Sequence, residues 1–142
     1  MPQNVGDKFT TISGVNNVMT AGTSDITHDG KVLLIDFWAT WCPPCQKPMA
    51  HNCEMIKSNG AKWANVRIIG LSIDDDAQTV KNHCTAKGWT QVEHVQVGNS
   101  GAADNWGITG VPHCALVNKN GEIVWRGHPM SVDLEAEINK LL

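Results

Sequence analysis

Residues 33–45 read LLIDFWATWCPPC, an apolar run that leads into two cysteines separated by two prolines. A nearly continuous apolar run is typical of a central strand covered on both faces, so we expect a strand over residues 31–39. Pro43 and Pro44 suit the first turn of a helix, because proline fixes φ and has no amide hydrogen to leave unpaired. The stretch therefore predicts a buried strand, a tight turn and a helix that begins at the prolines.

The Cys-x-x-Cys pair admits three chemical interpretations: half of a zinc site, a structural disulfide or a redox dithiol. Structural zinc sites usually need four ligands, and the other cysteines and the six histidines show no second pair at ligand spacing, so we expect no metal. A disulfide that closes so short a loop restricts the unfolded chain only slightly. At a helix N-terminus, however, unpaired amides and the helix dipole favour a thiolate on Cys42, the candidate nucleophile. Cys45, one turn later, can attack a mixed disulfide on Cys42, and the redox interpretation is favoured.

The rest of the chain alternates strand and helix patterns, which predicts an α/β fold with a mixed sheet and helices on both faces. Residues 9–27 are ambiguous and compatible with an extra N-terminal hairpin. Ser131 is a candidate N-cap for the last helix. The further elements that we expect are strands at 66–74 and 92–97, helices at 43–59, 75–89, 101–108 and 131–142, and a hairpin at 111–127 that turns at Asn120 and Gly121.

Length and composition are those of an ordinary globular chain. With 142 residues we expect one domain over residues 1–142, large enough to bury a core without metals or disulfides. A net charge of -3 gives no electrostatic reason to expect nucleic acid or an anionic membrane as a partner. The first residues lack the pattern of a secretory signal, and five cysteines, an odd number, do not resemble a secreted disulfide framework. We therefore expect a soluble cytoplasmic monomer.

Two stretches resemble the thioredoxin superfamily. Residues 33–45 look like its active-site strand and turn, and the CPPC form is similar to that of TlpA/ResA-like thiol-disulfide oxidoreductases and of nucleoredoxin and tryparedoxin relatives. Residues 107–127, GITGVPHCALVNKNGEIVWRG, resemble the family's segment around an active-site cis-proline and the two strands after it. The resemblance implies a thioredoxin-like three-layer sandwich. The chain between Asp74 and Val111 is longer than in a minimal thioredoxin, with room for an added helix and strand before that proline.

The same resemblance assigns roles to further residues. It implies that the Val111–Pro112 peptide is cis, although a trans bond is the better expectation from sequence alone. In the family, the backbone before this proline pairs with an extended substrate, and Trp41 would line the same surface. Asp36 matches a buried acid that assists proton transfer at the second cysteine, and a carboxyl among apolar residues has the raised pKa that this task needs. Gly70 stands where thioredoxins often have lysine.

The expected activity is reduction of protein disulfides by dithiol exchange through Cys42 and Cys45. It needs no bound cofactor, but a separate reductase or small thiol must resupply the electrons. One alternative is a thiol peroxidase, although peroxiredoxins present threonine three residues before the reactive cysteine, where this chain has Ala39. A second alternative is a non-enzymatic binding module whose groove binds a partner only when the cysteine pair is in one of its two oxidation states.

The remaining candidates are weaker. We interpret Cys53 and Cys114 as small core residues, and for Cys84 we favour packing over an oxidisable thiol. His113 follows Pro112 and is either close enough to the sulfurs to favour a thiolate or an inert strand residue. The acidic run 74–76 predicts a solvated loop and a helix N-terminus rather than a metal site.

Overall fold

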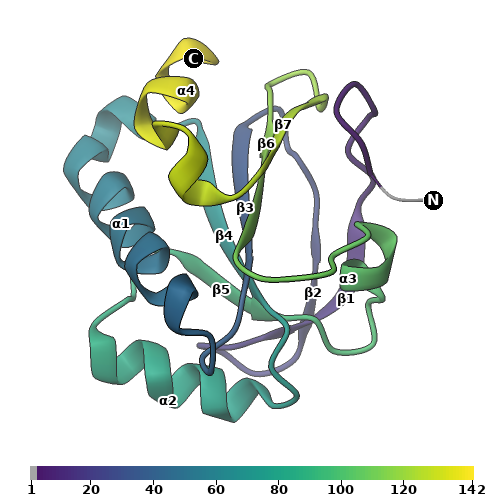
Figure 1. Ribbon diagram of the computed structural model, residues 1–142, viewed down its shortest axis with the longest axis vertical. Coiled ribbons are helices and arrows are strands. Elements are labelled where there is room, and N and C mark those ends of the chain that lie inside the picture. The colour runs from purple at the N-terminus through teal and green to yellow at the C-terminus, as the bar shows by residue number, and fades with distance from the viewer. Residues whose placement is uncertain (1–2) are drawn as a thin grey trace.

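One mixed sheet of seven strands runs through the computed structural model, which describes residues 3–142 (Figure 1). The strand order is β2-β1-β5-β4-β3-β6-β7; β3, β4 and β5 are mutually parallel, and the other neighbours pair antiparallel. The strands are β1 (Ile12–Asn17), β2 (Thr23–Ile26), β3 (Val32–Trp38), β4 (Val66–Ser72), β5 (Glu93–Gln96), β6 (His113–Val117) and β7 (Ile123–Gly127).

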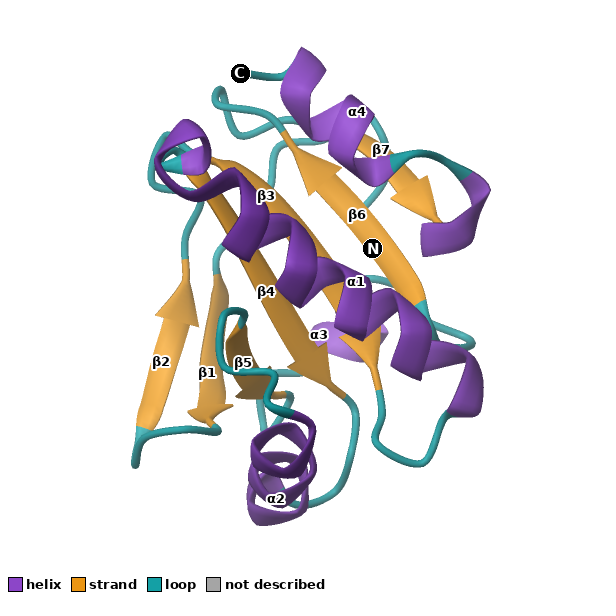
Figure 2. Ribbon diagram, turned by 90° about the vertical axis from the view of Figure 1, so that its left-hand side faces the viewer, coloured by secondary structure: helices purple, strands orange, loops and turns teal. Residues whose placement is uncertain are grey.

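Helices cover both faces of the sheet, as expected, but unequally. Figure 2 shows α1 crossing the sheet, with α2 and α4 on the same side and α3 behind the strands. Within residues 3–142, no helix is long and apolar enough to cross a bilayer. The helices are α1 (Pro43–Asn59), α2 (Ala77–Lys87), α3 (Ala102–Asn105) and α4 (Leu134–Lys140), with 3₁₀ turns at Gly60–Trp63 and Pro129–Ser131.

The core has two halves, one on each face of the sheet, and β3 contributes to both. All seven of its residues are buried. Leu34 and Trp38 pack towards α1, whereas Leu33, Ile35 and Phe37 pack towards the other face, because side chains alternate along a strand. This two-sided burial explains why the apolar run in the sequence is continuous.

Most expected elements are present, and the ambiguous segment does form a hairpin, β1–β2. The added helix and strand before the cis-proline are α2 and β5. The expectation that Ser131 caps the last helix is wrong: Asp133 is the N-cap, and its carboxylate accepts from the amide of Ala136. Residues 1 and 2 of the single domain expected over 1–142 lie outside the described residues.

A row of four residues crosses the sheet beneath α1. In the strand register, Cys114 pairs with Asp36, Asp36 with Gly70, and Gly70 with His94. A Cβ on Gly70 would lie 3.0 Å from Cε of Met49, 3.1 Å from Nδ1 of His94 and 3.3 Å from Nε1 of Trp38. Because Gly70 has no side chain, Met49 of α1 and the rings of His94 and Trp38 can pack directly against its backbone.

We predict that Gly70→Ala lowers the free energy of unfolding by about 1–3 kcal/mol, because the new methyl group overpacks a site where two rings cannot move easily. Urea unfolding followed by fluorescence measures the change. Gly110→Ala is the matched control, because nothing lies within 4 Å of a Cβ built there. Equal stability of the two variants would contradict the prediction.

Candidate active site

The two cysteines lie at the start of α1, just after the turn that follows β3. Cys42 is the N-cap residue, and its amide donates to the carbonyl of Ala39 at 3.2 Å. Cys42 and Cys45 are joined by a disulfide, with their Cα atoms 5.3 Å apart. Cys42 is 4% exposed and Cys45 is fully buried. The structure thus shows the oxidised pair, with Cys42 the sulfur nearer to the surface.

The segment before β6 lies directly against this pair. The Val111–Pro112 peptide has the cis form that the resemblance implies. The carbonyl oxygen of Val111 lies 3.6 Å from Sγ of Cys42, so it can accept from the thiol once the disulfide is reduced. The backbone before the proline and Cys42 therefore share one surface, as the resemblance implies.

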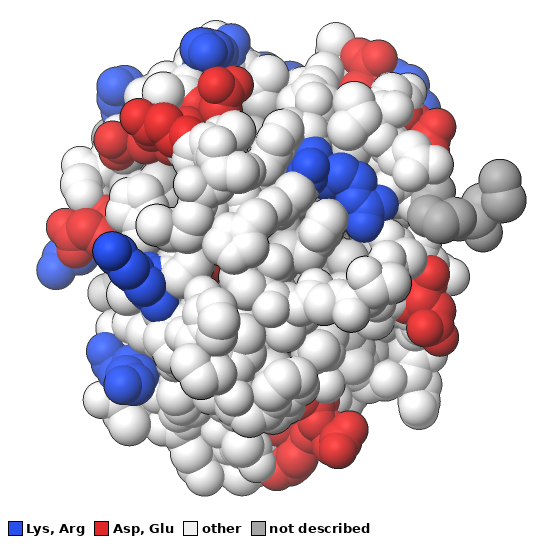
Figure 3. Space-filling model, in the orientation of Figure 1, with Lys and Arg blue, Asp and Glu red and all other residues white. Residues whose placement is uncertain are grey.

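A groove of about 580 Å³ opens over Cys42. Trp41, 65% exposed, forms part of its wall. None of the described residues that line the groove is Asp, Glu, Lys, Arg or His. Figure 3 likewise shows a largely uncharged centre on this face, with charged side chains mainly around its margin. The lining comprises Trp41, Cys42, Pro43, Pro44, Ile73, Ala103, Ile108, Thr109, Gly110 and Val111.

Asp36 is buried in the sheet layer beneath α1. Nδ2 of Asn52 donates to its Oδ2 at 2.8 Å, and the thiol of Cys114 lies against the same carboxyl group from the neighbouring strand. Burial raises the pKa of Asp36 to about 7, against the lowering effect of the bonds from Cys114 and Asn52. The carboxyl can therefore take up or release a proton near neutral pH.

Sequence reasoning missed Asn52 and gave Cys114 only a packing role. Asn52 follows Cys45 by seven residues, so helical periodicity places both on the buried face of α1, and this spacing could have identified it. Cys114 is buried as expected, but it also contacts Asp36. Burial, the negative charge of Asp36 and the hydrogen bond to it raise the pKa of the Cys114 thiol well above its usual value. The thiol therefore stays protonated beside the carboxyl group.

A buried carboxylate holds the turn before Cys42. Asp74 accepts from the amide of Thr40 at 2.9 Å, from its hydroxyl at 2.6 Å and from the hydroxyl of Ser72 at 2.6 Å. Asp74 is 5% exposed, so the expectation of a solvated acidic loop is wrong at its first residue. Asp76 does mark the start of α2, whose first amides donate to its carboxylate. Asp74, in the loop after β4, thus positions the turn at Thr40, 34 residues away along the chain.

The other candidates lie apart from this chemistry. Nε2 of His113 accepts from Nε of Arg126 at 3.0 Å, and burial together with the charges of Arg126 and His128 lowers the pKa of His113, which favours the neutral imidazole. Cys53 and Cys84 are buried as expected, and burial raises their thiol pKa values to about 11 and about 12. In the described part of the chain, no group of three or more His, Cys, Asp or Glu side chains could hold a metal ion.

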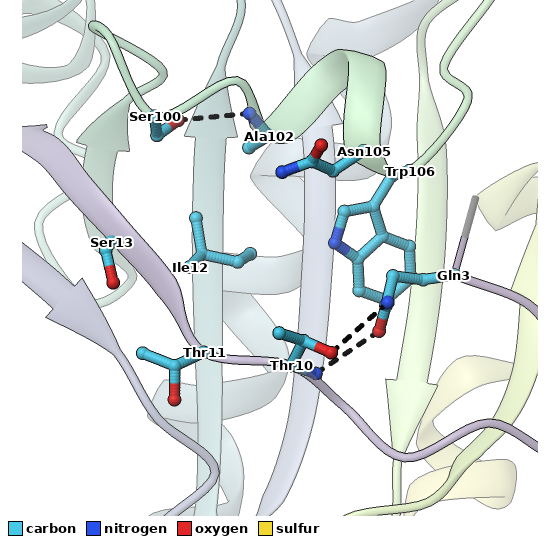
Figure 4. Close-up of a pocket in the computed structure, with 9 residues that line it drawn as sticks. All are labelled: Gln3, Thr10, Thr11, Ile12, Ser13, Ser100, Ala102, Asn105 and Trp106. Atoms are coloured by element: carbon cyan, nitrogen blue, oxygen red, sulfur yellow. Dashed lines mark hydrogen bonds between the residues drawn. The ribbon is translucent and has the colours of Figure 1, made fainter. Parts of the chain in front are cut away.

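A second hollow, of about 280 Å³, lies on the face that carries α3 (Figure 4). In it, Gln3 and Thr10 are joined by two hydrogen bonds, of 3.2 and 3.3 Å. The side chains drawn in Figure 4 include no thiol and no charged group. The reactive chemistry therefore belongs to the groove over Cys42. The hollow is lined by Gln3, Thr10, Thr11, Ile12, Ser13, Ser100, Ala102, Asn105 and Trp106.

Comparison with known proteins agrees with this arrangement. A family model described as thioredoxin-like matches residues 30–123. The thiol-disulfide oxidoreductase ResA of Bacillus thuringiensis is 29% identical over 114 residues. That match covers 79% of this chain but only 64% of ResA, so the chain spans somewhat less than two thirds of this relative.

Solved structures share the fold at low identity. A thiol:disulfide interchange protein from Bacteroides sp. has a TM-score of 0.77 and 21% identity, with 99% of this chain and 89% of that one covered. A peroxiredoxin-like protein from Aquifex aeolicus has a TM-score of 0.80 and 14% identity, with 100% and 90% covered. Identities this low establish the fold alone.

The buried Asp36 predicts a pH-dependent stability difference between the oxidised protein and its Asp36→Asn variant. The folded-state pKa of about 7 exceeds the ordinary 3.8, so the native state binds more protons than the unfolded state between these values. Wild-type stability should therefore fall as pH rises through this window. At pH 8 we expect the variant to be more stable by about 2–4 kcal/mol, with the gap closing towards pH 4.

Urea unfolding of the disulfide form between pH 4 and pH 8 measures this difference. Asp75→Asn, which removes an exposed carboxylate, is the control and should change stability little at any pH. A gap between wild type and Asp36→Asn that does not vary with pH would rule out the raised pKa.

Proposed function

The chain belongs to the thioredoxin-like family, and we propose that it is a thiol-disulfide oxidoreductase that reduces protein disulfides through Cys42 and Cys45. One observation carries the proposal: a disulfide at the start of α1, with Cys42 lining an open groove and Cys45 fully buried behind it. A structural bridge has no need of such a groove. The relative ResA, named a thiol-disulfide oxidoreductase, supports the same reaction class.

In the proposed reaction, the Cys42 thiolate of the reduced enzyme attacks one sulfur of a substrate disulfide. A bond forms between Cys42 and that sulfur, and the second substrate sulfur leaves as a thiolate that takes up a proton. The Cys45 thiolate then attacks Sγ of Cys42, closes the intramolecular disulfide and releases the remaining substrate sulfur. Two electrons pass from the dithiol to the substrate, and a separate reductase or small thiol returns them.

Asp36 would receive the proton of Cys45. Cys45 becomes nucleophilic only as a thiolate, and a buried thiol loses its proton with difficulty. A carboxyl group with a pKa of about 7 is partly ionised at neutral pH and can accept that proton. Asn52, two turns after Cys45 on the same helix, holds the carboxyl group in place.

The groove favours an extended, uncharged substrate segment. Val111 offers backbone groups beside Cys42, where a peptide could pair as an added strand. The lining offers apolar contact and no charged side chain, so acidic or basic residues next to the substrate cysteine would lose hydration without gaining an ion pair. The class of substrate is thus a disulfide flanked by uncharged residues.

The two alternative functions, a thiol peroxidase and a redox-gated binding module, have little support. For a thiol peroxidase, Ala39 supplies no hydroxyl near Cys42, and the likeness to a peroxiredoxin-like structure concerns the fold. A redox-gated binding module would use the same groove, and equal affinity of a partner for the oxidised and reduced forms would argue against it. The cytoplasmic location and the monomeric state stay predictions, to be tested by cell fractionation and by sedimentation.

The central prediction concerns insulin reduction with dithiothreitol. Cys42→Ser should lower turnover to the rate of dithiothreitol alone, because the nucleophile is lost. In a separate reaction without dithiothreitol, pre-reduced Cys45→Ser should form the mixed disulfide with insulin but not resolve it, so a covalent complex should accumulate on a non-reducing gel. Cys53→Ala removes a buried cysteine outside the pair and is the control. Wild-type turnover by Cys42→Ser would sink the proposed function.

A second prediction concerns Trp41. Trp41→Ala should raise the KM for insulin about two- to tenfold, because an aromatic wall of the groove is lost where the peptide packs. A small linear disulfide without aromatic groups, such as bis(2-hydroxyethyl) disulfide, should be affected much less. Steady-state kinetics with both substrates provide the measurement, and an equal loss with both would remove Trp41 from the peptide-binding surface.

A further inference from the structure

The side chain of Gln46, directly after Cys45, folds back over the turn that carries Cys42. Its Nε2 lies 2.9 Å from the carbonyl oxygen of Cys42, 3.3 Å from that of Thr40 and 3.4 Å from that of Ala39. Carbonyl oxygens only accept, so the NH₂ end of the amide must face them. The orientation of the amide follows, and Oε1 points away from the turn.

His83 of α2 binds the other end of this amide. Its Nε2 lies 2.7 Å from Oε1 of Gln46, and because Oε1 can only accept, Nε2 must carry the hydrogen. The imidazole packs against two indole rings, with ring centroids 5.9 Å from Trp38 and 5.5 Å from Trp89, and the two indoles also contact each other. Nε2 bears a hydrogen in this neutral tautomer and in the charged form alike, so the bond survives protonation.

We propose that His83 is a positioning residue for the dithiol and acts through Gln46. The proposal rests on the proposed function in taking Cys42 and Cys45 as the reactive pair. It assigns to the inserted helix α2 a part in the chemistry of the site, 37 residues from Gln46 along the chain.

The reason lies in the scarcity of donors at the start of α1. Pro43 and Pro44 have no amide hydrogen, so the turn lacks two donors that a different pair of residues would supply. The carbonyl oxygens of this turn, including that of Cys42 itself, converge on Nε2 of Gln46, and the negative ends of such dipoles disfavour a thiolate in the same turn. The amide hydrogens of Gln46 offset these dipoles and fix the turn, and His83 holds the amide in the orientation that does so.

The test uses variants that keep the packing and remove the bonds. Gln46→Met retains chain length without an amide, and His83→Phe retains a ring beside the two tryptophans without a donor. The readout is the rate at which iodoacetamide alkylates Cys42 in the reduced protein, from pH 5 to pH 9, with the adduct located by peptide mapping. Gln78→Met and His51→Phe, exposed positions on α2 and α1, are the matched controls.

At pH 7 we expect alkylation to slow about two- to tenfold in Gln46→Met and by a smaller factor in His83→Phe, as loss of one hydrogen bond implies. The pH profile of alkylation should shift upward in both variants. In the Gln46→Met background, His83→Phe should have no further effect, because its route to the turn is gone. His83→Gln, which restores an N–H donor, should recover part of the rate.

A wild-type rate in Gln46→Met, or an equal factor for His83→Phe with and without Gln46, would overturn the proposal. So would effects of the same size in the two control variants. The alkylation assay needs no disulfide substrate. A protein that fails to reduce insulin but shows these effects would therefore overturn the proposed function and leave the positioning role standing.

Discussion

The burial of β3 on both faces is the constraint on which the site depends. Because each of its seven residues is enclosed, the strand is fixed in the middle of the sheet, and the chain leaves it at one defined point. Asp36 shares that enclosure, which gives the carboxyl group its high pKa. The turn that follows then places Cys42 at the start of α1, with Val111 opposite. The same apolar contacts that stabilise the fold thus set the acid and the sulfurs in their places.

The parts of this arrangement that could be predicted are local or carried by the resemblance. An apolar run of strand length, two prolines after a cysteine and a second cysteine three residues after the first suffice to predict β3, the turn and the dithiol. The resemblance supplied the partner segment at Val111. The hydrogen bonds that hold the turn could not be predicted, because they join residues 34 and 37 positions apart. The sequence around Asp74 or His83 does not indicate which distant segment either side chain contacts in the fold.

Stability and reactivity make opposite demands on Asp36. At neutral pH its ionised form has lost water and gained few partners, so the native state carries an electrostatic cost there. An apolar residue or a permanently neutral amide would avoid that cost, but neither could exchange a proton with Cys45, as we propose for Asp36. The site therefore retains a residue that lowers the free energy of unfolding at neutral pH and above. Such a compromise is common at functional positions.

Gly70 restricts how this site could change over evolutionary time. Many thioredoxins carry a lysine at the corresponding position, but here the space above the backbone is taken by Met49, His94 and Trp38. A lysine could enter only after at least one of these neighbours had become smaller, and each such step alone would leave a void. A change between the glycine-bearing and the lysine-bearing form would thus pass through less stable intermediates. Evolution by single substitutions would therefore tend to retain whichever residue a lineage already has at this position.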